Sequence, residues 1–544
     1  MLTTLAAPAF AGTWYIEDGD ITISAGKTEG TNKVSQGSTT DEEDTDTVIT
    51  NNNRDTASSH TVTIEAKDKD DKVEVTLKDV NIDASSRNEA AVSVTGSGNT
   101  TIKLDGDNAL KSDTSRSGIY GSGSLTISGG ENDSLTAQGG SGANGITSSG
   151  SLTISGGTVT ATGGNSTDSV GSGGRGIYSV SGDVTISGGT VNANGGDGKN
   201  GSGGSGITSL GSLTISGGTV NAAGGDGTNS SDGGDGITNN RGVTISSGGT
   251  VTAKGGSGED GSGGRGISSF GGVTISSGGT VTATGGNSTG SDGSGGDGIS
   301  STSTTISGGT VTADGGSGNF SGGNGIRSFD VAISGGTVNV AGGNGGNGSG
   351  SDVGNGIYSS DIDLSGSLEL TAKAGSPNGK ALSQRGNELD LNTIKDKLGP
   401  GAKVTVTDAD GKVNQVSIPR PVEPEEPVIP EESSSSSDGG SATPSTPASS
   451  LPGLTVTDKS GAVISYTSTQ SGNTLTVCVG RFTASLRASL SALRQLRAEG
   501  IETITFQTIL CSTTLSVDEL LAMGGEDAEA VLTHRLTDSS LTVG

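Results

Sequence analysis

Residues 206–222 read Gly-Ile-Thr-Ser-Leu-Gly-Ser-Leu-Thr-Ile-Ser-Gly-Gly-Thr-Val-Asn-Ala, and variants of this unit fill the middle of the chain. The Gly-Ile pair recurs at intervals of 27 to 32 residues, with its isoleucine at Ile119, Ile146, Ile177, Ile207, Ile237, Ile267, Ile299, Ile326 and Ile357. A fixed period of this length predicts a solenoid, because one unit cannot bury its own apolar face whereas stacked neighbours can.

Within each unit, apolar residues alternate with polar ones, as the side chains of a half-buried β-strand do. Gly217-Gly218 is expected to turn the chain, and Thr and Ser are expected to face out. The Gly-rich remainder, such as residues 195–204, is expected to be a connection whose glycines supply the positive φ of tight corners. The alternation assigns to the interior Leu213, Ile215, Val220 and Ala222, and two units later Val273, Ile275, Val281 and Ala283.

The composition is unusual for a folded chain of 544 residues. Only 28% of the residues are hydrophobic and 2% are aromatic, whereas 101 are glycine. Such values usually indicate disorder, but a narrow β-solenoid needs only a few small branched side chains per coil. The 31 basic and 59 acidic residues give a net charge of −28, which argues against nucleic-acid binding and would repel an acidic polysaccharide unless a divalent cation bridges the two.

Changes in composition divide the chain into six expected segments. They are residues 1–11, the remnant of a signal peptide; 12–113, an N-terminal cap with atypical coils; 114–375, the regular repeats; 376–418, a C-terminal cap; 419–450, a linker of Pro, Ser and Glu; and 451–544, a small α+β domain of unknown role.

Finer patterns predict local structure inside these segments. The polar stretch 27–60 is expected to be a long loop, and residues 403–416 are expected to contain a hairpin that closes the solenoid. In the last domain the sequence predicts helices at 485–499, 517–523 and 527–532.

The first residues indicate export. Residues 2–11 resemble the end of a secretory signal with a cleavage site at Ala9-Phe10-Ala11, although a basic region is missing and a short disordered tail is the alternative. The expected location is extracellular or at the cell surface. The sequence contains no run of 18 apolar residues and therefore predicts no transmembrane segment. In an exported chain, Cys478 and Cys511 could form a disulfide, and two buried thiols are the alternative.

Catalytic motifs are not recognisable in the sequence. Its two histidines, His60 and His534, are far apart in sequence, which disfavours a Ser-His-Asp or Cys-His arrangement. Arg175 and Arg265 precede equivalent Gly-Ile pairs but lie three coils apart, and the repeats offer no cluster of Asp, Arg and Lys on adjacent coils. The glycine pattern at 171–176 is not followed by a helix, so a phosphate-binding loop is excluded. We therefore expect no enzymatic activity.

Calcium is the expected cofactor, because the Gly-rich connections carry carboxylates and flexible backbone carbonyls, and Ca²⁺ takes several oxygen ligands. Solvated loop charge is the alternative. The candidate ligands are Asp197, Asp226, Asp232, Asp235, Glu259, Asp260, Asp292 and Asp297.

Pairs of outward threonines recur on the coils and predict a flat polar strip that could bind an extended polymer or ice, although threonine is also simply a good exposed strand residue. The pairs are Thr158/Thr160, Thr250/Thr252, Thr280/Thr282 and Thr310/Thr312, and Asn192, Asn221 and Asn339 interrupt the second column. Sugar stacking is expected to be minor, since the repeats carry few aromatic residues: Tyr120, Tyr178, Phe270, Phe320, Phe329 and Tyr358.

The unit at 206–222, the opening segment 13–23, Val80-Asn-Ile-Asp83 and the segment 104–110 together resemble clostridial "carbohydrate-binding domain-containing" surface proteins. The resemblance covers residues 12–418. It implies a right-handed parallel β-helix and a link to calcium and to plant cell-wall polymers such as pectic acid and cellulose.

The leading hypothesis is thus a non-catalytic, calcium-assisted polysaccharide-binding protein for plant cell-wall or similar glycans. One alternative is a rigid stalk or adhesin that presents residues 451–544 to a protein partner, and another is a polysaccharide lyase.

Overall fold

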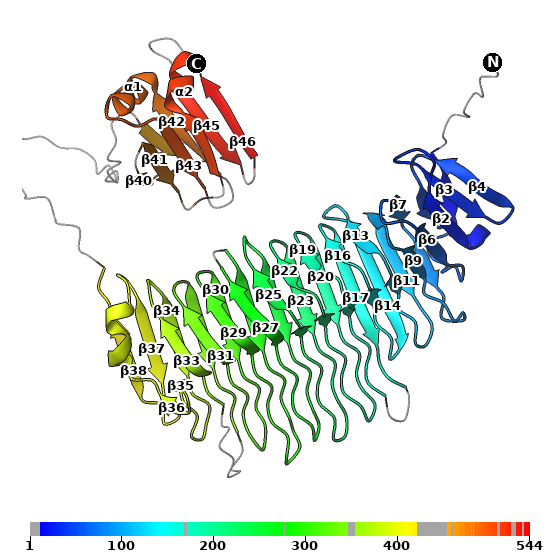
Figure 1. The fold of residues 1–544 in the computed structure, drawn as a ribbon, viewed down its shortest axis with the longest axis horizontal. Helices are drawn as coiled ribbons and strands as arrows, with labels where there is room; N and C mark the ends of the chain where they lie inside the picture. Colours follow the sequence, from blue (N-terminus) through cyan, green and yellow to red (C-terminus); the bar gives the residue numbers. More distant parts are fainter. Residues whose placement is uncertain are drawn as a thin grey trace, which may run out of the picture. The chain divides into compact units, whose positions relative to one another are not determined.

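The computed structural model describes residues 11–167, 171–276, 278–345 and 354–420, and most of the segment from 454 to 543. By its internal contacts the chain divides into two compact units, residues 1–424 and 425–544, which are considered separately. Figure 1 shows the first unit as a solenoid and the second as a small mixed unit.

The coils of the solenoid place their strands in three columns, here called the first, second and third face. Strands of one face pair in parallel with the same face of the next coil, as Ile207↔Ile237 and Val220↔Val251 do. The first and second faces belong to a 25-stranded sheet and the third to a 13-stranded sheet. The prediction of a solenoid is therefore confirmed, with about 14 turns.

The first face contains β9 (Val92–Gly96), β12 (Ile119–Gly121), β15 (Ile146–Ser148), β18 (Ile177–Ser179), β21 (Ile207–Ser209), β24 (Ile237–Asn239) and β35 (Leu382–Gln384). The second contains β7 (Lys72–Lys78), β10 (Asn99–Asp105), β13 (Ser124–Ser128), β16 (Leu152–Ile154), β19 (Val184–Ile186), β22 (Leu213–Ile215) and β25 (Gly242–Ile245). Four strands run through both faces: β27 (Ile267–Ile275), β29 (Ile299–Ile306), β31 (Ile326–Ile333) and β33 (Ile357–Leu364). The third face contains β8 (Asn81–Asp83), β11 (Asp107–Lys111), β14 (Ser134–Ser141), β17 (Thr158–Gly164), β20 (Thr190–Asn194), β23 (Thr219–Ala223), β26 (Thr250–Lys254), β28 (Thr280–Thr284), β30 (Thr310–Asp314), β32 (Thr337–Ala341), β34 (Glu369–Lys373) and β37 (Lys403–Thr407).

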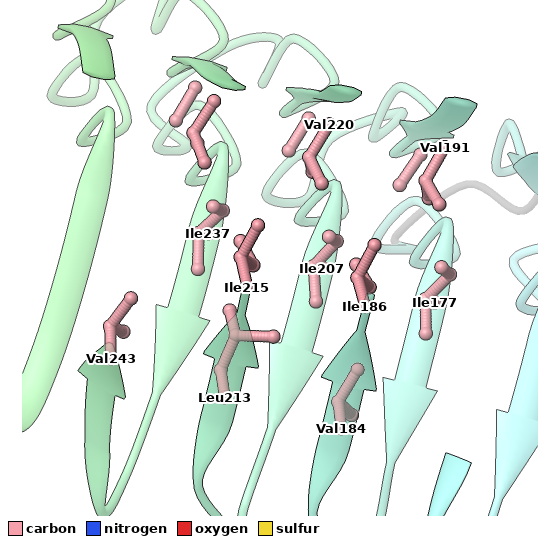
Figure 2. Close-up of a cluster of buried hydrophobic side chains, with 14 of the residues drawn as sticks. Ile177, Val184, Ile186, Val191, Ile207, Leu213, Ile215, Val220, Ile237 and Val243 are labelled. Carbon is pink, nitrogen blue, oxygen red and sulfur yellow. The ribbon is translucent and has the colours of Figure 1, made fainter. Parts of the chain in front are cut away.

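The interior is lined by the residues that the alternation assigned to it. Leu213, Ile215 and Val220 are completely buried, and their equivalents in neighbouring coils stack above and below them (Figure 2). Full burial of such a side chain stabilises the fold by about 1.5–3 kcal/mol. Each coil adds only a few of these groups, so the apolar fraction of the chain stays low although its core is continuous.

A column of buried serines corrects the expectation that Ser faces out. Ser148, Ser179 and Ser209 are fully buried, and each hydroxyl donates to a backbone carbonyl two or three residues ahead, as Ser179 Oγ does to Gly182 O at 2.6 Å. Asn239 takes the same place in its coil, and its Nδ2 donates to Gly211 O at 2.7 Å. These side chains satisfy carbonyls of the corner between the first and second faces, so the polar residue stabilises the turn from inside.

The described parts of the Gly-rich segments form a regular stack along one side of the solenoid (Figure 1). The two legs of each segment pack backbone to backbone: Gly264 N donates to Gly256 O and Gly256 N to Gly234 O, both at 2.8 Å. A Cβ added at Gly264 would lie 1.9 Å from Gly234 O. Glycine is needed at this position because no side chain fits between neighbouring coils, and not for positive φ, which corrects the prediction. Positive φ is instead found at the turn that enters the third face, as at Gly218 (φ 72°).

The N-terminal cap corrects the loop predicted at 27–60. That stretch contains β3 (Asn32–Gln36), β4 (Thr39–Asp44) and β5 (Val48–Thr50), and β3 pairs antiparallel with β2 (Ile21–Ala25) and β4. The acidic run ends at Asp44, whose carboxylate accepts hydrogen bonds from Gly12 N at 2.9 Å and Trp14 Nε1 at 2.8 Å and is therefore stable when buried. The remaining elements of the cap are β1 (Thr13–Tyr15), the 3-10 helix η1 (Ile16–Asp18) and β6 (Val62–Ala66).

The C-terminal end of the solenoid is closed by the predicted hairpin, in which β37 pairs antiparallel with β38 (Val413–Ser417). The 3-10 helix η2 (Leu391–Lys397) and the short strand β36 (Asn387–Glu388) complete this end.

The second unit has its own core around Phe506 and Leu493. Its elements are β39 (Leu454–Thr457), β40 (Thr467–Ser471), β41 (Thr474–Cys478), β42 (Thr483–Ser489), α1 (Leu490–Ala498), β43 (Thr503–Gln507), β44 (Ser512–Ser516), α2 (Val517–Met523), β45 (Glu529–Arg535) and β46 (Asp538–Val543). The strands form two four-stranded sheets.

Two of the three predicted helices of this unit need correction. Residues 485–489 end β42, because Ala484, Leu486 and Ala488 alternate inward and Ser489 caps α1 by accepting Ala492 N at 3.2 Å. Most of 527–532 lies in β45, where Ala530 and Leu532 alternate inward. Among the described residues, no helix is long and apolar enough to cross a membrane.

Candidate functional site

A groove of about 350 Å³ crosses four consecutive coils where the Gly-rich segments meet the first face. Two columns of glycines contribute to its lining, which also contains the Ser262, Ser294 and Ser321 side chains. We call this feature the groove. Its lining residues are Asp232, Gly233, Asp235, Ser262–Arg265, Ser294–Asp297, Phe320–Asn324 and Arg327.

Three charged side chains of the groove come from the same position, two residues before the Gly-Ile isoleucine, in three consecutive coils. They are Asp235, Arg265 and Asp297, and their isoleucines Ile237, Ile267 and Ile299 pair in register. The Arg265 Nε lies 3.9 Å from Asp297 Oδ2. The expectation that no Asp and Arg cluster on adjacent coils is therefore wrong: spacing in sequence varies with the loop length, whereas the strand register aligns the three residues.

The carboxylates of this cluster are held by backbone and side-chain donors. Asp235 Oδ1 accepts the N–H of Arg265 at 2.7 Å and its Oδ2 accepts Thr238 Oγ1 at 3.0 Å. Burial raises the pKa of Asp235, and the hydrogen bond from Arg265 N only partly opposes this effect. Asp297 Oδ1 accepts both the N–H and the side-chain Nδ2 of Asn324, at 2.8 and 2.9 Å. The acidic side chains are thereby fixed beside a guanidinium that is only partly buried.

Several candidate calcium ligands make the same kind of backbone contact elsewhere on the Gly-rich segments. Asp197 Oδ1 accepts Asp226 N at 2.9 Å, Asp226 Oδ1 accepts Ser257 N at 2.7 Å, and Asp232 Oδ1 accepts Ser262 N at 2.7 Å. Asn165 does the same for Asp197 N at 2.9 Å, so an uncharged amide serves equally well at this position. These carboxylates therefore act as acceptors that connect one coil to the next.

The remaining candidates are exposed. Glu259 Oε2 accepts Asn229 N at 2.9 Å, while Asp260 and Asp292 lie at the surface. Over the described part of the chain, no three or more His, Cys, Asp or Glu side chains come together in an arrangement that could hold a metal ion. Calcium binding stays a prediction.

A second line of side chains follows the first face and is here called the outer column. Its members stand one residue after each Gly-Ile isoleucine or its equivalent and pair in register from coil to coil. The Arg175 guanidinium carbon lies 4.6 Å above the ring of Tyr178, a cation–π contact. The outer column consists of Ser93, Tyr120, Thr147, Tyr178, Thr208, Thr238, Ser268, Ser300, Arg327 and Tyr358.

The most exposed aromatic rings of the solenoid gather on the same coils as the groove. Phe320 lines the groove and is 48% exposed, and Phe329, two residues after Arg327, is 70% exposed. Phe270 lies in β27, five residues after Arg265, and is 72% exposed. Of these three rings, only that of Phe320 belongs to the lining of the groove.

A second hollow, of about 370 Å³, lies nearer the N-terminal end and is here called the N-terminal hollow. It combines Tyr120, which is 43% exposed, with Arg116 and several hydroxyl groups. Its lining residues are Asn88, Glu89, Ala90, Ser93, Ser115–Ser117, Tyr120 and Thr147.

The predicted threonine strip lies on the third face. Thr250, Thr280 and Thr310 pair in register, as do Thr252 and Thr282 in the second column. The asparagines of the second column continue the strip, since Asn221 Nδ2 donates to Asn192 Oδ1 at 2.9 Å. A function for this strip stays a prediction.

Four segments of the chain, residues 152–177, 184–206, 213–237 and 305–326, match a sequence family described as "Beta helix repeat". The first unit is a parallel β-helix. No curated protein and no solved structure matches the chain.

His60, His534 and Cys478 are not among the residues that line the groove. His60 Nδ1 lies 3.3 Å from Asp20 Oδ1 in the N-terminal cap, and His534 is buried in the second unit between Thr508 and Thr513. Cys478 is a partly buried thiol whose Sγ lies 3.5 Å from Gln507 Oε1. Cys511 lies outside the described residues, so the disulfide stays a prediction.

Sequence reasoning missed the groove. It named Arg265 only together with the distant Arg175, and it did not consider Arg327, which follows the Gly-Ile pair whereas Arg175 and Arg265 precede it. Strand register supplies the missing signal. Positions before and after the recurring Gly-Ile isoleucine border the same surface of the coil, so arginines in either position can line one groove.

Proposed function

We propose that the β-helix is a non-catalytic polysaccharide-binding protein and that the groove is its principal contact surface. The observation that carries this proposal is the combination, in one groove across four coils, of two arginines, an exposed aromatic ring and a column of hydroxyls. Binding sites for ligands typically combine apolar or aromatic surface with a few fixed polar groups.

Each component of the groove suits a sugar. The exposed ring of Phe320 can contact the C–H face of a pyranose, and the hydroxyls of Ser262 and Ser294 can exchange hydrogen bonds with sugar hydroxyls. Arg265 and Arg327 offer planar guanidinium groups, which bind carboxylates in a bidentate manner. This set supports plant cell-wall or similar glycans, including acidic ones, and agrees with the resemblance to clostridial carbohydrate-binding surface proteins.

Calcium assistance and an extracellular or cell-surface location belong to the same proposal. The net charge of −28 motivates the first, since a divalent cation would reduce the repulsion between this protein and an acidic glycan. The two arginines of the groove offer a second way to bind a carboxylate, and the experiment below separates the two.

Retention of the full chain on immobilised polygalacturonate and on cellulose tests the proposal. Each column is run in calcium buffer and again with EDTA, with bovine albumin as an acidic control protein. Retention on either polymer supports glycan binding, and loss of retention in EDTA assigns a role to calcium. Passage through both columns in both buffers would contradict the proposal.

A lyase-like enzyme is a second candidate, favoured by the juxtaposition of Asp235, Arg265 and Asp297. Burial raises the pKa of Asp235, as is found for general bases and acids. Release of unsaturated uronides from polygalacturonate by the wild-type chain, and its loss in Arg265→Ala, would establish this activity. Both carboxylate oxygens of Asp235 already accept hydrogen bonds, from Arg265 N and from Thr238 Oγ1, and this favours binding over catalysis.

A stalk that presents the second unit is a further candidate, supported by the division of the chain into two compact units with separate cores. Cell or protein binding by residues 451–544 alone, with no glycan binding by the full chain, would favour this function over the first.

A further inference from the structure

The groove and the N-terminal hollow lie along one line of the β-helix. Tyr120 lines the hollow and Arg327 lines the groove, and both belong to the outer column. Register is continuous between them through seven coil-to-coil steps. At roughly 4.8 Å per coil the two residues are about 34 Å apart along the axis.

The two features carry similar chemistry. The N-terminal hollow has the ring of Tyr120, the guanidinium of Arg116 and the hydroxyls of Ser93 and Ser117, and the groove has a phenyl ring, two guanidinium groups and serine hydroxyls. Arg116 Nε donates to Asn88 Oδ1 at 3.0 Å, which fixes the side chain at the rim. The two hollows therefore offer the same kinds of contact at two points along the outer column.

The surface between them is also suited to a sugar chain. Tyr178 lies two coils from Tyr120, and the Arg175 guanidinium lies above the Tyr178 ring. The small side chains of Thr208, Thr238, Ser268 and Ser300 follow in the next coils and pair in register, so no bulky side chain of the outer column stands between Tyr178 and Arg327.

We propose, on the basis of the proposed function, that the N-terminal hollow and the groove are two subsites for one linear glycan that lies along the outer column. A pyranose unit extends such a chain by about 5 Å, close to the coil spacing, so bridging both subsites takes about seven units. Shorter oligosaccharides reach one subsite at a time. Linking two weak contacts in one ligand raises the overall affinity through the effective concentration of the second contact.

Calorimetric titration of the full chain with the trimer and the nonamer of α-1,4-galacturonan tests this inference. Xylo-oligosaccharides of the same lengths serve as the uncharged series. Two trimers bind each chain, whereas one nonamer binds and does so at least about ten-fold more tightly. In Tyr120→Ala the trimer stoichiometry falls to one, and the nonamer loses about ten-fold in affinity because one subsite is gone.

Tyr15→Ala is the matched control, since Tyr15 is a similarly exposed tyrosine of the N-terminal cap outside the outer column. It leaves both titrations unchanged. A nonamer that binds no more tightly than the trimer, or an unchanged nonamer affinity in Tyr120→Ala, would overturn the two-subsite inference while glycan binding itself stands. Failure of both series to bind the wild-type chain would overturn the proposed function and this inference with it.

Discussion

Asp235 accepts the backbone N–H of Arg265 across two neighbouring coils, with 2.7 Å between Oδ1 and N. The same contact recurs with asparagine in other coils, where Asn144 accepts Arg175 N at 2.8 Å and Asn355 accepts Lys380 N at 2.9 Å. A side-chain carbonyl oxygen at this position therefore connects successive coils, and in the groove it also fixes the chain that carries the Arg265 side chain.

Replacing Asp235 by asparagine is expected to stabilise the β-helix at neutral pH. The amide oxygen still accepts Arg265 N, and the burial that raises the pKa of Asp235 no longer opposes a charge. A raised pKa means that the folded state holds the proton more tightly than the unfolded state, so this carboxyl stabilises less as the pH rises above about 3.8. Thermal unfolding of D235N and wild type should therefore differ at pH 7 and converge below pH 4.

Asp235→Ala is the matched comparison for this variant. It removes the acceptor together with the charge, so the free energy of unfolding should fall by about 1 kcal/mol below that of D235N. Equal stabilities of the alanine and asparagine variants would show that the contact to Arg265 N contributes nothing.

Gly264→Ala is expected to destabilise the Gly-rich stack severely. Its Cβ would lie 1.9 Å from Gly234 O and 2.5 Å from the carbonyl carbon of the same residue, and backbone atoms of a neighbouring leg cannot move aside. We expect a loss of about 3 kcal/mol or more in unfolding free energy, measured by urea denaturation. Gly248→Ala is the control: φ is +87° with nothing within 4 Å of the added Cβ, so only backbone strain of about 1–2 kcal/mol applies. Similar losses in both variants would refute the close backbone packing of neighbouring coils.

The contrast between these glycines shows where sequence reasoning stops. Period and alternation were enough to place Leu213, Ile215 and Val220 in the core, because inward and outward positions differ chemically. Composition cannot distinguish a glycine that turns the chain, such as Gly218, from one that lets two backbones touch, such as Gly264. That distinction depends on which leg lies opposite, and only the stacked structure supplies it.

Ile215→Ala should cost about 2–5 kcal/mol, since it opens a cavity in a column that is completely buried. Thr214→Ala, the adjacent outward residue, should change the unfolding free energy by no more than about 0.5 kcal/mol. Thermal and urea unfolding of the two variants measure the difference. A larger loss of unfolding free energy in Thr214→Ala than in Ile215→Ala would contradict the assignment of Ile215 to the interior and Thr214 to the surface.

The second unit should become less stable as the pH falls below about 6.5. Burial lowers the pKa of His534, whose Nε2 lies 3.0 Å from Thr513 Oγ1 and whose ring packs at 4.7 Å from Phe506. A lowered pKa means that the unfolded state takes up a proton first, so the stability that the neutral ring contributes is present above the ordinary pKa and declines below it. Hydrogen exchange of the Phe506 and Leu532 amides at pH 7 and pH 5 measures the effect.

His534→Gln provides the control for the pH effect, because it keeps a polar side chain near both threonines and does not titrate in this range. Exchange rates corrected for intrinsic pH dependence should then be nearly equal at the two pH values. The same residual pH dependence in His534→Gln and wild type would exclude His534 as its origin.

The site was less predictable than the fold for a physical reason. Each of Asp235, Arg265 and Phe320 is an ordinary surface residue in its own repeat, and loop lengths that vary between repeats hide their alignment in sequence. Strand register brings them together, and several of the carboxylates expected to bind calcium accept backbone N–H groups of the next coil. A coil-by-coil alignment on the Gly-Ile isoleucine would have revealed the cluster, but the hydrogen bonds require coordinates.

Titration of the α-1,4-galacturonan nonamer into the wild-type chain and into the Arg265→Ala/Arg327→Ala variant, both in calcium buffer, tests the glycan-binding groove most directly. Lys254→Ala, which removes an exposed cation from the third face, is the matched control. We expect the double variant to lose at least about ten-fold in affinity, because charged hydrogen bonds are removed, and Lys254→Ala to bind as wild type does. Equal affinities of the double variant and wild type would contradict it.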